Sequence, residues 1–372
     1  MNFQNTFKNR RILVTGDTGF KGSWLCEWLL AEGAEVYGLG LAPNTKPALF
    51  DQLNLANRIH HNQLDIRDAK ALRDYVAQVD PEIVFHLAAQ PLVRLSYEIP
   101  VETYATNVMG TVHLLDAIRQ LQCSPSAIRH PLSVVCVTTD KCYENKEWLH
   151  GYREEDPMGG HDPYSSSKGA CEIAIQSFRK SYFNDPQSCG VAVASARAGN
   201  VIGGGDWALD RIIPDCVRAL QNGESIPVRN KVATRPWQHV LEPLGGYMLL
   251  AAELWRGLNN QTPLQANFSY DNLCGAFNFG PELASNRSVD ALVKEVLKFW
   301  PGEWEDRSNP NAHHEASLLN LAIDKAHHML NWKPRWDFEK TIQQTIDWYH
   351  TAQSADCNMQ AFTQNQIKAY QL

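Results

Sequence analysis

The residues best placed to do chemistry are a tyrosine and a lysine four positions apart. Tyr164 and Lys168 lie at i and i+4, which puts both side chains on one face if the segment is helical. A nearby ammonium group stabilises a phenolate, so this spacing predicts a tyrosine whose pKa is lowered toward neutrality. Such a tyrosine can act as a general base or acid toward the hydroxyl of a sugar or an alcohol.

A glycine-rich turn near the N-terminus offers a second functional element. Gly16, Gly19 and Gly22 follow the apolar run 11–15 and open a helical pattern. Glycine lets the backbone turn tightly and approach a pyrophosphate, whose charge the helix N-terminus favours. The pattern predicts a dinucleotide cofactor, with a purely structural turn as the alternative. The second predicted strand ends in Gly-Leu-Gly-Leu over 38–41, without a carboxylate or an arginine, so this position leaves NAD and NADP open.

Two acidic residues bear on how such a cofactor is held. Asp65 follows the predicted third strand and is placed to contact the adenine end of a dinucleotide, with a helix cap or a loop acid as the alternative. Asp17 lies inside the glycine-rich turn. A carboxylate beside a pyrophosphate repels it, so we expect Asp17 to weaken cofactor binding unless its side chain points away.

Alternating strand and helix patterns must position these groups. Short apolar runs predict strands over 11–15, 35–39, 82–87, 132–137, 191–196 and 277–280. Apolar residues at helical spacing predict helices over 23–32, 68–79, 101–121, 164–183, 242–256 and 288–299. The alternation predicts an α/β protein with a Rossmann-type, doubly wound parallel sheet and a smaller C-terminal α/β substrate lobe.

The length of 372 residues fits this division into two parts. We expect residues 1–199 to form the dinucleotide-binding domain, with segments near 235–255 and 275–282 returning to it. Residues 200–372 are then expected to form mainly the substrate lobe.

Composition narrows the classes of function. Apolar residues make up 44% of the chain and charged residues 20%, which is ordinary for a globular protein. Lys and Arg number 34 against 41 Asp and Glu, and the net charge of −7 argues against a nucleic-acid partner. A local basic pocket for a small anion remains compatible with that charge. No apolar run approaches the roughly 20 residues that span a bilayer, so we predict no membrane partner.

Cysteine and histidine usage points the same way. The nine cysteines are scattered, their number is odd and no C-x-x-C motif occurs, so we predict reduced thiols and a cytoplasmic location. The pairs His313-His314 and His327-His328 match no metal-ligand spacing, and we predict no metal site.

Several motifs together resemble the extended short-chain dehydrogenase/reductase family. They are the glycine-rich turn, the segment His-Leu-Ala-Ala-Gln over 86–90, the segment Asn-Val-Met-Gly-Thr over 107–111, and the Tyr164/Lys168 pair. The resemblance covers nearly the whole chain and implies a nucleotide-linked sugar as substrate, with the nucleotide held by the C-terminal lobe. It also implies a tightly held NAD that is regenerated in each turnover. The residues expected to contact NAD are Gly16, Thr18, Gly19, Phe20, Lys21, Gly22, Asp65, Ile66, Ala88, Ala89, Gln90, Asn107, Tyr164 and Lys168.

The segment after the predicted strand 132–137 bears on the reaction. It carries Thr139, Asp140 and Lys141, at the strand end where ligands bind in a doubly wound sheet. In the resembled family a Ser or Thr here contacts the sugar 4-hydroxyl, and the 4,6-dehydratases add two proton-transfer residues, most often Asp-Glu. The Asp-Lys pair is similar to the branch that acts on CDP-linked glucose. Three further stretches share this similarity, at 19–25, 197–207 and 235–240.

The resemblance implies conversion of CDP-linked glucose to a 4-keto-6-deoxy sugar and water, within deoxysugar biosynthesis for a lipopolysaccharide O-antigen. Tyr164 takes the 4-hydroxyl proton, Lys141 removes the C5 proton, and Asp140 protonates the leaving 6-hydroxyl. The last two roles require a neutral lysine beside a protonated aspartic acid, so one proton shared by the pair is an alternative description. A surface salt bridge in a loop is the non-functional alternative.

Four residues are candidates for binding the substrate: Arg94, Asn200, Arg211 and Arg235. A guanidinium group matches the geometry of phosphate oxygens, although an ordinary surface charge is the alternative for each arginine. The preference for CDP comes from the resemblance alone. The resemblance also implies a homodimer or homotetramer, with contacts through the helices at 101–121 and 164–183.

Three other functions remain open from the sequence. One is a nucleotide-sugar 4-epimerase, in which Asp140 and Lys141 would be idle. The second is a 4,6-dehydratase that acts on another nucleotide-hexose. The third is a non-catalytic dinucleotide-sensing protein, against which the presence of both Tyr164 and Lys168 counts.

Overall fold

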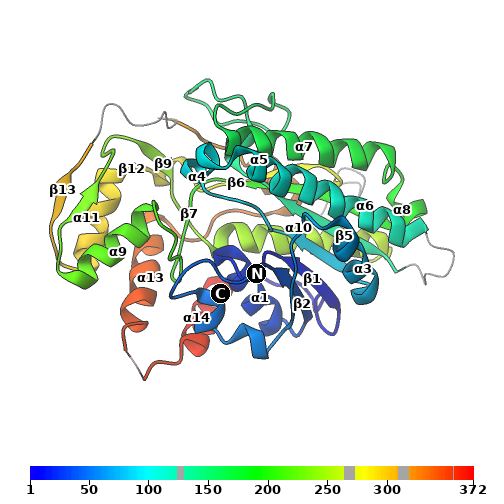
Figure 1. The fold of residues 1–372 in the computed structure, drawn as a ribbon, viewed down its shortest axis with the longest axis horizontal. Coiled ribbons are helices and arrows are strands. Elements are labelled where there is room, and N and C mark those ends of the chain that lie inside the picture. The colour runs from blue at the N-terminus through cyan, green and yellow to red at the C-terminus, as the bar shows by residue number, and fades with distance from the viewer. Residues whose placement is uncertain (124–129, 264–272, 309–317, 355) are drawn as a thin grey trace.

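The centre of the protein is a seven-stranded parallel sheet with the order β11-β6-β5-β4-β1-β2-β3 (Figure 1). The structure is a computed structural model that describes residues 1–123, 130–263, 273–308, 318–354 and 356–372. The strands are β1 (Arg11–Thr15), β2 (Glu35–Gly40), β3 (His60–Gln63), β4 (Ile83–His86), β5 (Leu132–Val137), β6 (Val191–Ala198) and β11 (Ala276–Phe279). The strand order reverses between β1 and β4, which is where ligands bind in such sheets. The predicted doubly wound fold is confirmed.

Helices cover both faces of the sheet because successive strand residues point to opposite sides. Ile12 and Val14 of β1 pack in a core with residues of α1 (Phe20–Ala31) and α10 (Leu241–Leu258). Leu13, between them, packs in the opposite core, whose helices are α3 (Ala69–Val79), α6 (Gly110–Cys123) and α7 (Pro163–Ser181). Figure 1 shows these two helical layers on opposite sides of the sheet.

The helix predicted over 101–121 is confirmed, but it is interrupted by a π-helical turn. The structure has α5 (Pro100–Tyr104), a π-helical segment (Ala105–Met109) and then α6. Apolar periodicity does not distinguish a π-helical turn from the α-helix around it, and such turns often occur at functional sites. This one carries the buried Asn107. The other predicted strands and helices are confirmed, with shifts of up to three residues at their ends.

Shorter elements of the C-terminal half group beside one end of the sheet (Figure 1). The small strand pairs are β10–β7, β12–β9 and β13–β8. The strands are β7 (Val201–Ile202), β8 (Ile226–Val228), β9 (Thr234–Pro236), β10 (Gln238–His239), β12 (Asn286–Ser288) and β13 (Trp304–Asp306). The helices are α9 (Ile212–Asn222), α11 (Val289–Phe299), α12 (Asp324–Leu330), α13 (Phe338–Thr351) and α14 (Met359–Gln371). The predicted domain limits stay a prediction, although β11 of this half pairs with β6 in the central sheet.

Two other sequence-based predictions concern cysteines and membrane spans. Eight cysteines within the described residues are free thiols, and the side chain of Cys123 lies outside them. Among the helices that the structure describes, none has both the length and the apolar character needed to cross a bilayer.

Candidate active site

The start of α7 fixes where Tyr164 and Lys168 lie. Asp162 caps the helix, since its carboxylate accepts hydrogen bonds from the Ser165 backbone at 2.9 Å and the Ser165 hydroxyl at 2.6 Å. Pro163 occupies the first helical position, where its missing N–H costs nothing. Tyr164 therefore begins the first turn, with Lys168 one turn later, and both side chains are buried. The ammonium of Lys168 donates to the Val137 carbonyl at the end of β5, 3.4 Å away.

Tyr164 meets the end of β5 at Thr139, whose side chain is hydrogen-bonded to it. Burial raises the pKa of Tyr164 above its ordinary value, while the hydrogen bond with Thr139 opposes this rise. Our prediction that the tyrosine pKa is lowered is therefore wrong for the protein alone. The physical reason is that removing a phenolate from water outweighs the nearby charges, among which Asp140 raises the pKa and Arg211 lowers it.

The Asp-Lys pair lies in a short 3₁₀ turn directly after β5 (Asp140–Cys142). The Thr139 hydroxyl donates to the Asp140 carboxylate at 3.0 Å, and the Lys141 ammonium lies 3.7 Å from the same carboxylate oxygen. Asp140 is only 2% exposed, and its second oxygen, Oδ2, has no hydrogen-bond partner among the residues that the structure describes. This oxygen faces Gly199, where an added Cβ would lie 3.0 Å from it. An unpaired buried carboxylate oxygen is costly to keep, which is typical of a functional site.

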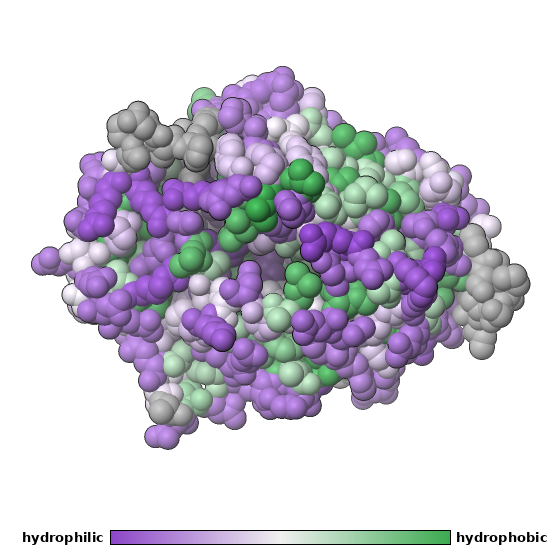
Figure 2. All heavy atoms as spheres, viewed as in Figure 1, coloured by the Kyte–Doolittle hydropathy of each residue, from purple (hydrophilic) through white to green (hydrophobic). Residues whose placement is uncertain are grey.

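A pocket opens beside this carboxylate. Its lining includes Gly199, which the Asp140 carboxylate faces, together with Pro236, Glu282, Asn286 and Asn320. Figure 2 shows that the face of the molecule in view is hollowed near its middle. The Asp140 carboxylate therefore lies behind Gly199, a residue of the pocket wall.

Beneath the site, the helix and the sheet are joined by a buried ion pair that the sequence analysis did not identify. Glu172 lies one turn after Lys168, and its carboxylate lies 2.8 Å from the Arg197 guanidinium of β6. The same carboxylate accepts hydrogen bonds from the hydroxyls of Thr138 and Ser195. The signal was present in the sequence, since Tyr164, Lys168 and Glu172 repeat at i+4. This pair holds α7 against the ends of β5 and β6.

The glycine-rich turn has the shape that a pyrophosphate site requires. Gly16 has a φ of +77°, and an added Cβ there would lie 2.8 Å from the backbone nitrogen of Ala88. A Cβ on Gly22 would lie 2.0 Å from the Gly16 carbonyl oxygen, closer than any real contact. Gly19 is exposed at the N-terminal end of α1. This exposed, side-chain-free helix start fits the diphosphate of a dinucleotide.

Asp17 points away from the turn and into the protein. Its carboxylate is fully buried, and Oδ2 lies 2.6 Å from the Nδ1 atom of His61 on β3. Gly38 and Gly40 of β2 make room for it, since an added Cβ on Gly38 would lie 2.0 Å from Oδ2. We expected Asp17 to weaken cofactor binding unless its side chain pointed away, and the side chain does point away from the turn.

Asn107 ties the segment after β4 to the catalytic helix. Its side-chain oxygen accepts from the Gln90 backbone at 2.8 Å, and its amide donates to the Gln90 carbonyl and to the Ser167 hydroxyl. The Gln90 side chain turns toward Thr103, to which it donates at 2.9 Å. Asn107 thus positions the backbone of the segment that includes Ala88 and Ala89, where the nicotinamide side of the cofactor was predicted.

At the adenine end, the predicted residues surround the third strand. Asp65 follows β3, forms an ion pair with Arg67 at 2.6 Å, and has a pKa lowered by that hydrogen bond. The cap of α3 is Asp68, so the alternative role for Asp65 as a helix cap is wrong. Ile66 is buried against Gly110, and Thr18 donates to the Leu41 carbonyl at 2.9 Å.

A group of cations lies between the glycine-rich turn and the catalytic residues. Burial and the nearby charges of Arg211 and Lys168 together lower the pKa of Lys21 to about 8, while Asp140 and Asp206 oppose this shift. Arg211 pairs with Asp206 at 2.8 Å, a partner that the sequence analysis did not single out. The structure thus brings Lys21, Arg211 and Lys168 to one region, where an anion would be stabilised.

The other cofactor and substrate predictions are placed less directly. Phe20 lies beside Gly203, where an added Cβ would be 3.2 Å from its ring. Arg235, on β9, donates to the Thr234 carbonyl at 2.8 Å. Asn200 lies between β6 and β7, and its carbonyl accepts from the Gln238 backbone. Arg94 lies on α4 (Val93–Glu98), half exposed and paired with Asp210 at 3.3 Å.

Within the described residues there is no group of three His, Cys, Asp or Glu side chains arranged to hold a metal ion. His327 and His328 lie on α12, and their rings contact one another. His313 and His314 lie outside the described residues.

Comparisons with known proteins place the chain among sugar-modifying enzymes. The family model for GDP-mannose 4,6 dehydratase matches residues 13–345. A CDP-glucose 4,6-dehydratase from Salmonella typhimurium is 46% identical over 352 residues, which cover 93% of this chain and 92% of that protein. The family resemblance drawn from the sequence motifs is thereby confirmed.

Solved structures share the fold. A UDP-glucose 4-epimerase from Thermotoga maritima, solved with UDP-glucose, superposes with a TM-score of 0.75 at 19% identity, covering 92% of this chain and 99% of that one. A dTDP-glucose 4,6-dehydratase from Streptomyces venezuelae, solved with NAD and TYD bound, superposes with a TM-score of 0.74 at 23% identity, covering 91% and 96%.

Proposed function

The chain belongs to the GDP-mannose 4,6 dehydratase family of extended short-chain dehydrogenases/reductases, and from this premise we propose that it converts CDP-glucose to CDP-4-dehydro-6-deoxy-glucose and water. The enzyme is an NAD-dependent hydro-lyase. The carrying observation is the placement of Asp140 between Thr139 and Lys141, with an unpaired carboxylate oxygen beside a pocket. An enzyme that only oxidises and rotates a sugar has no need of such a proton donor and acceptor beside the tyrosine.

Tyr164 and Thr139 are proposed to act at the sugar 4-hydroxyl. Their hydrogen bond places two hydroxyl groups together at the end of β5, where one can orient the substrate hydroxyl and the other take its proton. Lys168 lies one turn after the tyrosine and adds a positive charge that favours the phenolate. The chemistry that NAD supplies when bound is oxidation at C4 and the matching reduction at C6.

Asp140 and Lys141 are proposed to remove water from the oxidised sugar. The C4 ketone makes the C5 proton acidic, so Lys141 can remove it while Asp140 protonates the departing 6-hydroxyl. The atoms balance, because one proton leaves C5 and one proton is delivered to the hydroxyl that departs as water. The 3.7 Å separation supports a pair that exchanges one proton within the site.

The cation group is proposed to hold the substrate diphosphate. Arg211 is supported most strongly, because its charge acts on both Lys21 and Tyr164. Arg235 and Asn200 are supported by their place near the pocket, in the segments around Pro236 and Gly199. The predicted residues around the glycine-rich turn and Asp65 are proposed to hold NAD.

We also propose a homo-oligomer built through α5, α6 and α7. These helices and the π-helical segment carry large apolar side chains that are 40–75% exposed. They are Val101, Tyr104, Met109 and Ile173. Burying them against a second copy removes apolar area from water. Light scattering at the monomer mass contradicts this part. A cytoplasmic location is proposed from the reduced thiols.

The test is product identification with purified protein and a panel of CDP-, dTDP-, GDP- and UDP-linked glucose. We expect mass spectrometry to show loss of one water from CDP-glucose alone, and Tyr164→Phe to abolish it. A product of unchanged mass identifies an epimerase. Loss of water from another nucleotide-glucose shifts the base preference and leaves the reaction in place. Binding of NAD without turnover of any substrate contradicts the proposal.

A further inference from the structure

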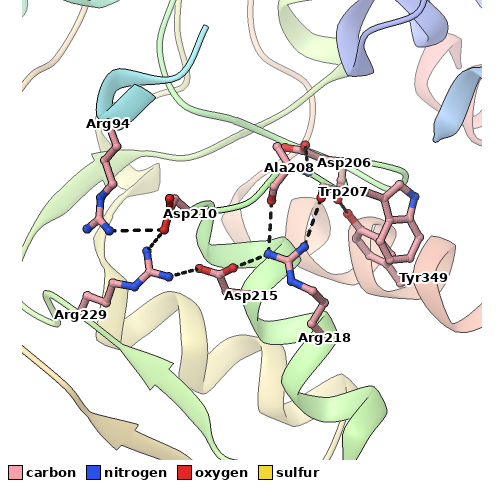
Figure 3. A network of polar contacts seen from close by, with 9 residues as sticks. All are labelled: Arg94, Asp206, Trp207, Ala208, Asp210, Asp215, Arg218, Arg229 and Tyr349. Carbon is pink, nitrogen blue, oxygen red and sulfur yellow. Dashed lines mark hydrogen bonds and ion pairs between the residues drawn. The ribbon is translucent and has the colours of Figure 1, made fainter. Parts of the chain in front are cut away.

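A bridging carboxylate joins the tip of the turn that carries Arg211 to the sheet domain. Asp210 lies at the tip of this turn, and its Oδ1 atom pairs with Arg94 of α4 at 3.3 Å and with Arg229, directly after β8. Figure 3 shows the Asp210 carboxylate between the two guanidinium groups, with Arg94 reaching from the sheet domain and Arg229 from the C-terminal half. The bridge thus connects the two parts of the protein at the mouth of the site.

The beginning of the turn is held from both parts of the protein. The Trp207 indole nitrogen donates to the Gln52 side chain of α2 (Leu49–Gln52) at 2.9 Å, and the other contacts come from the C-terminal half. Arg218 of α9 donates to the carbonyls of Trp207 and Ala208, at 3.2 and 3.3 Å (Figure 3). The Tyr349 hydroxyl of α13 donates to the carbonyl of Asp206 at 2.5 Å. These contacts fix the beginning of the turn, and the Asp210 carboxylate fixes its tip.

The backbone at Asp210 makes the tip dependent on that carboxylate. Its φ of +62° lies in the left-handed region, which non-glycine residues adopt at a cost in free energy and which Asn and Asp tolerate best. This conformation reverses the chain just before Arg211, the N-cap residue of α9. The backbone position of Arg211 therefore follows from the turn at Asp210, while its guanidinium pairs with Asp206 at 2.8 Å.

We propose that Asp210 is a positioning residue: by joining Arg94 to Arg229 it holds the turn across the mouth of the site and fixes Arg211 where the substrate diphosphate binds. The part that concerns the diphosphate rests on the proposed function. All three side chains are between 41% and 44% exposed, so each pair is screened by salt and is individually weak.

The first test measures the turn without any substrate. Asp210→Asn removes the charge while keeping a residue that tolerates the left-handed backbone, and Arg94→Gln removes the partner from the sheet domain. We expect faster hydrogen exchange of the amides over 206–211 in both variants, and wild-type exchange in Arg94→Lys, which keeps the cation. A matched control is Lys294→Gln, which breaks an exposed pair on α11 far from this turn. Unchanged exchange in Asp210→Asn overturns the proposal.

The second test measures binding of CDP by calorimetry. We expect Asp210→Asn to weaken CDP binding about threefold to fivefold, with the same change in KM for turnover and little change in kcat. The double variant with Arg94→Gln is expected to bind no more weakly than either single variant, because both remove one bridge. Tighter CDP binding by Asp210→Asn overturns the proposal, since Asp210 would then compete with the diphosphate for the arginines. A protein that fails to dehydrate CDP-glucose refutes the proposed function, whereas the exchange result stands independently.

Discussion

Asp17 lies in the glycine-rich turn, yet its carboxylate is 2.6 Å from the imidazole of His61 on β3. The pair ties the turn to the third strand and keeps a negative charge away from the exposed start of α1. Burial raises the pKa of Asp17, and the hydrogen bond with Asp17 raises the pKa of His61. An acid in the cofactor loop is thus tolerated because its partner and its space come from β2 and β3.

This pair predicts a loss of stability as pH rises. Both groups bind protons more tightly in the folded than in the unfolded protein, so their stabilising contribution is present at low pH and is lost as pH rises through the raised values. For His61 the loss begins above its ordinary value of about 6.5. We expect wild type to lose stability relative to Asp17→Asn between pH 6 and pH 8. Urea unfolding at both pH values measures this, with Asp290→Asn on α11 as the control. Parallel pH curves for wild type and Asp17→Asn contradict it.

Gly22→Ala is expected to distort the cofactor loop. The added Cβ would lie 2.0 Å from the Gly16 carbonyl oxygen, so the backbone must move. We expect NAD affinity to fall at least tenfold and stability to fall by about 1–3 kcal/mol. The control is Gly223→Ala, which has a φ of +69° but no atom within 4 Å of the added Cβ. It should lose stability by about 1 kcal/mol without losing NAD affinity. Wild-type NAD binding by Gly22→Ala, measured by calorimetry, refutes the role given to this turn.

Thr139→Val is expected to move the pH profile of the reaction. The hydrogen bond with Thr139 opposes the rise that burial causes in the pKa of Tyr164, so removing the hydroxyl raises that pKa further. A smaller fraction of phenolate at neutral pH should lower kcat by about 10²–10⁴-fold and shift the acidic limb of the pH–rate profile to higher pH. Thr139→Ser retains a hydroxyl and should keep the wild-type limb. If Thr139→Val loses activity with no shift of the limb, the hydrogen bond does not tune the tyrosine.

Glu172→Gln is expected to destabilise the protein rather than act on the chemistry directly. The change leaves Arg197 buried without its counter-charge, which costs about 3–5 kcal/mol. Lys70→Gln breaks a solvent-exposed pair with Asp74 and should leave the melting temperature close to that of wild type. Thermal unfolding of the two variants compares these costs directly. Equal melting temperatures would show that the buried pair does not hold α7 against the sheet.

The sequence was sufficient for features that depend on local spacing. The i, i+4 repeat placed Tyr164 and Lys168 on one helix face, and the alternation of strands and helices predicted the sheet. Contacts between distant segments could not be predicted in this way. One example is the Asp17–His61 pair, whose members are 44 positions apart. The left-handed backbone of Asp210 is a further feature that the spacing of residues does not reveal. The direction of the pKa shift of Tyr164 could not be predicted either, because it depends on burial by segments that periodicity does not identify.

The separate roles of Asp140 and Lys141 predict two different failures. Lys141→Met removes the base and leaves the first oxidation possible, so the 4-keto intermediate should form without exchanging its C5 proton for deuterium in heavy water. Asp140→Asn keeps the shape of the side chain but cannot supply a proton to the 6-hydroxyl, so C5 exchange should continue while loss of water falls by about 10²–10⁴-fold. Mass spectrometry of the sugar follows both steps in one reaction. The Lys141 ammonium lies only 3.7 Å from the Asp140 carboxylate, so a proton can pass between the two groups and their roles can be exchanged. Persistent C5 exchange in Lys141→Met would reverse the assignment and make Asp140 the base.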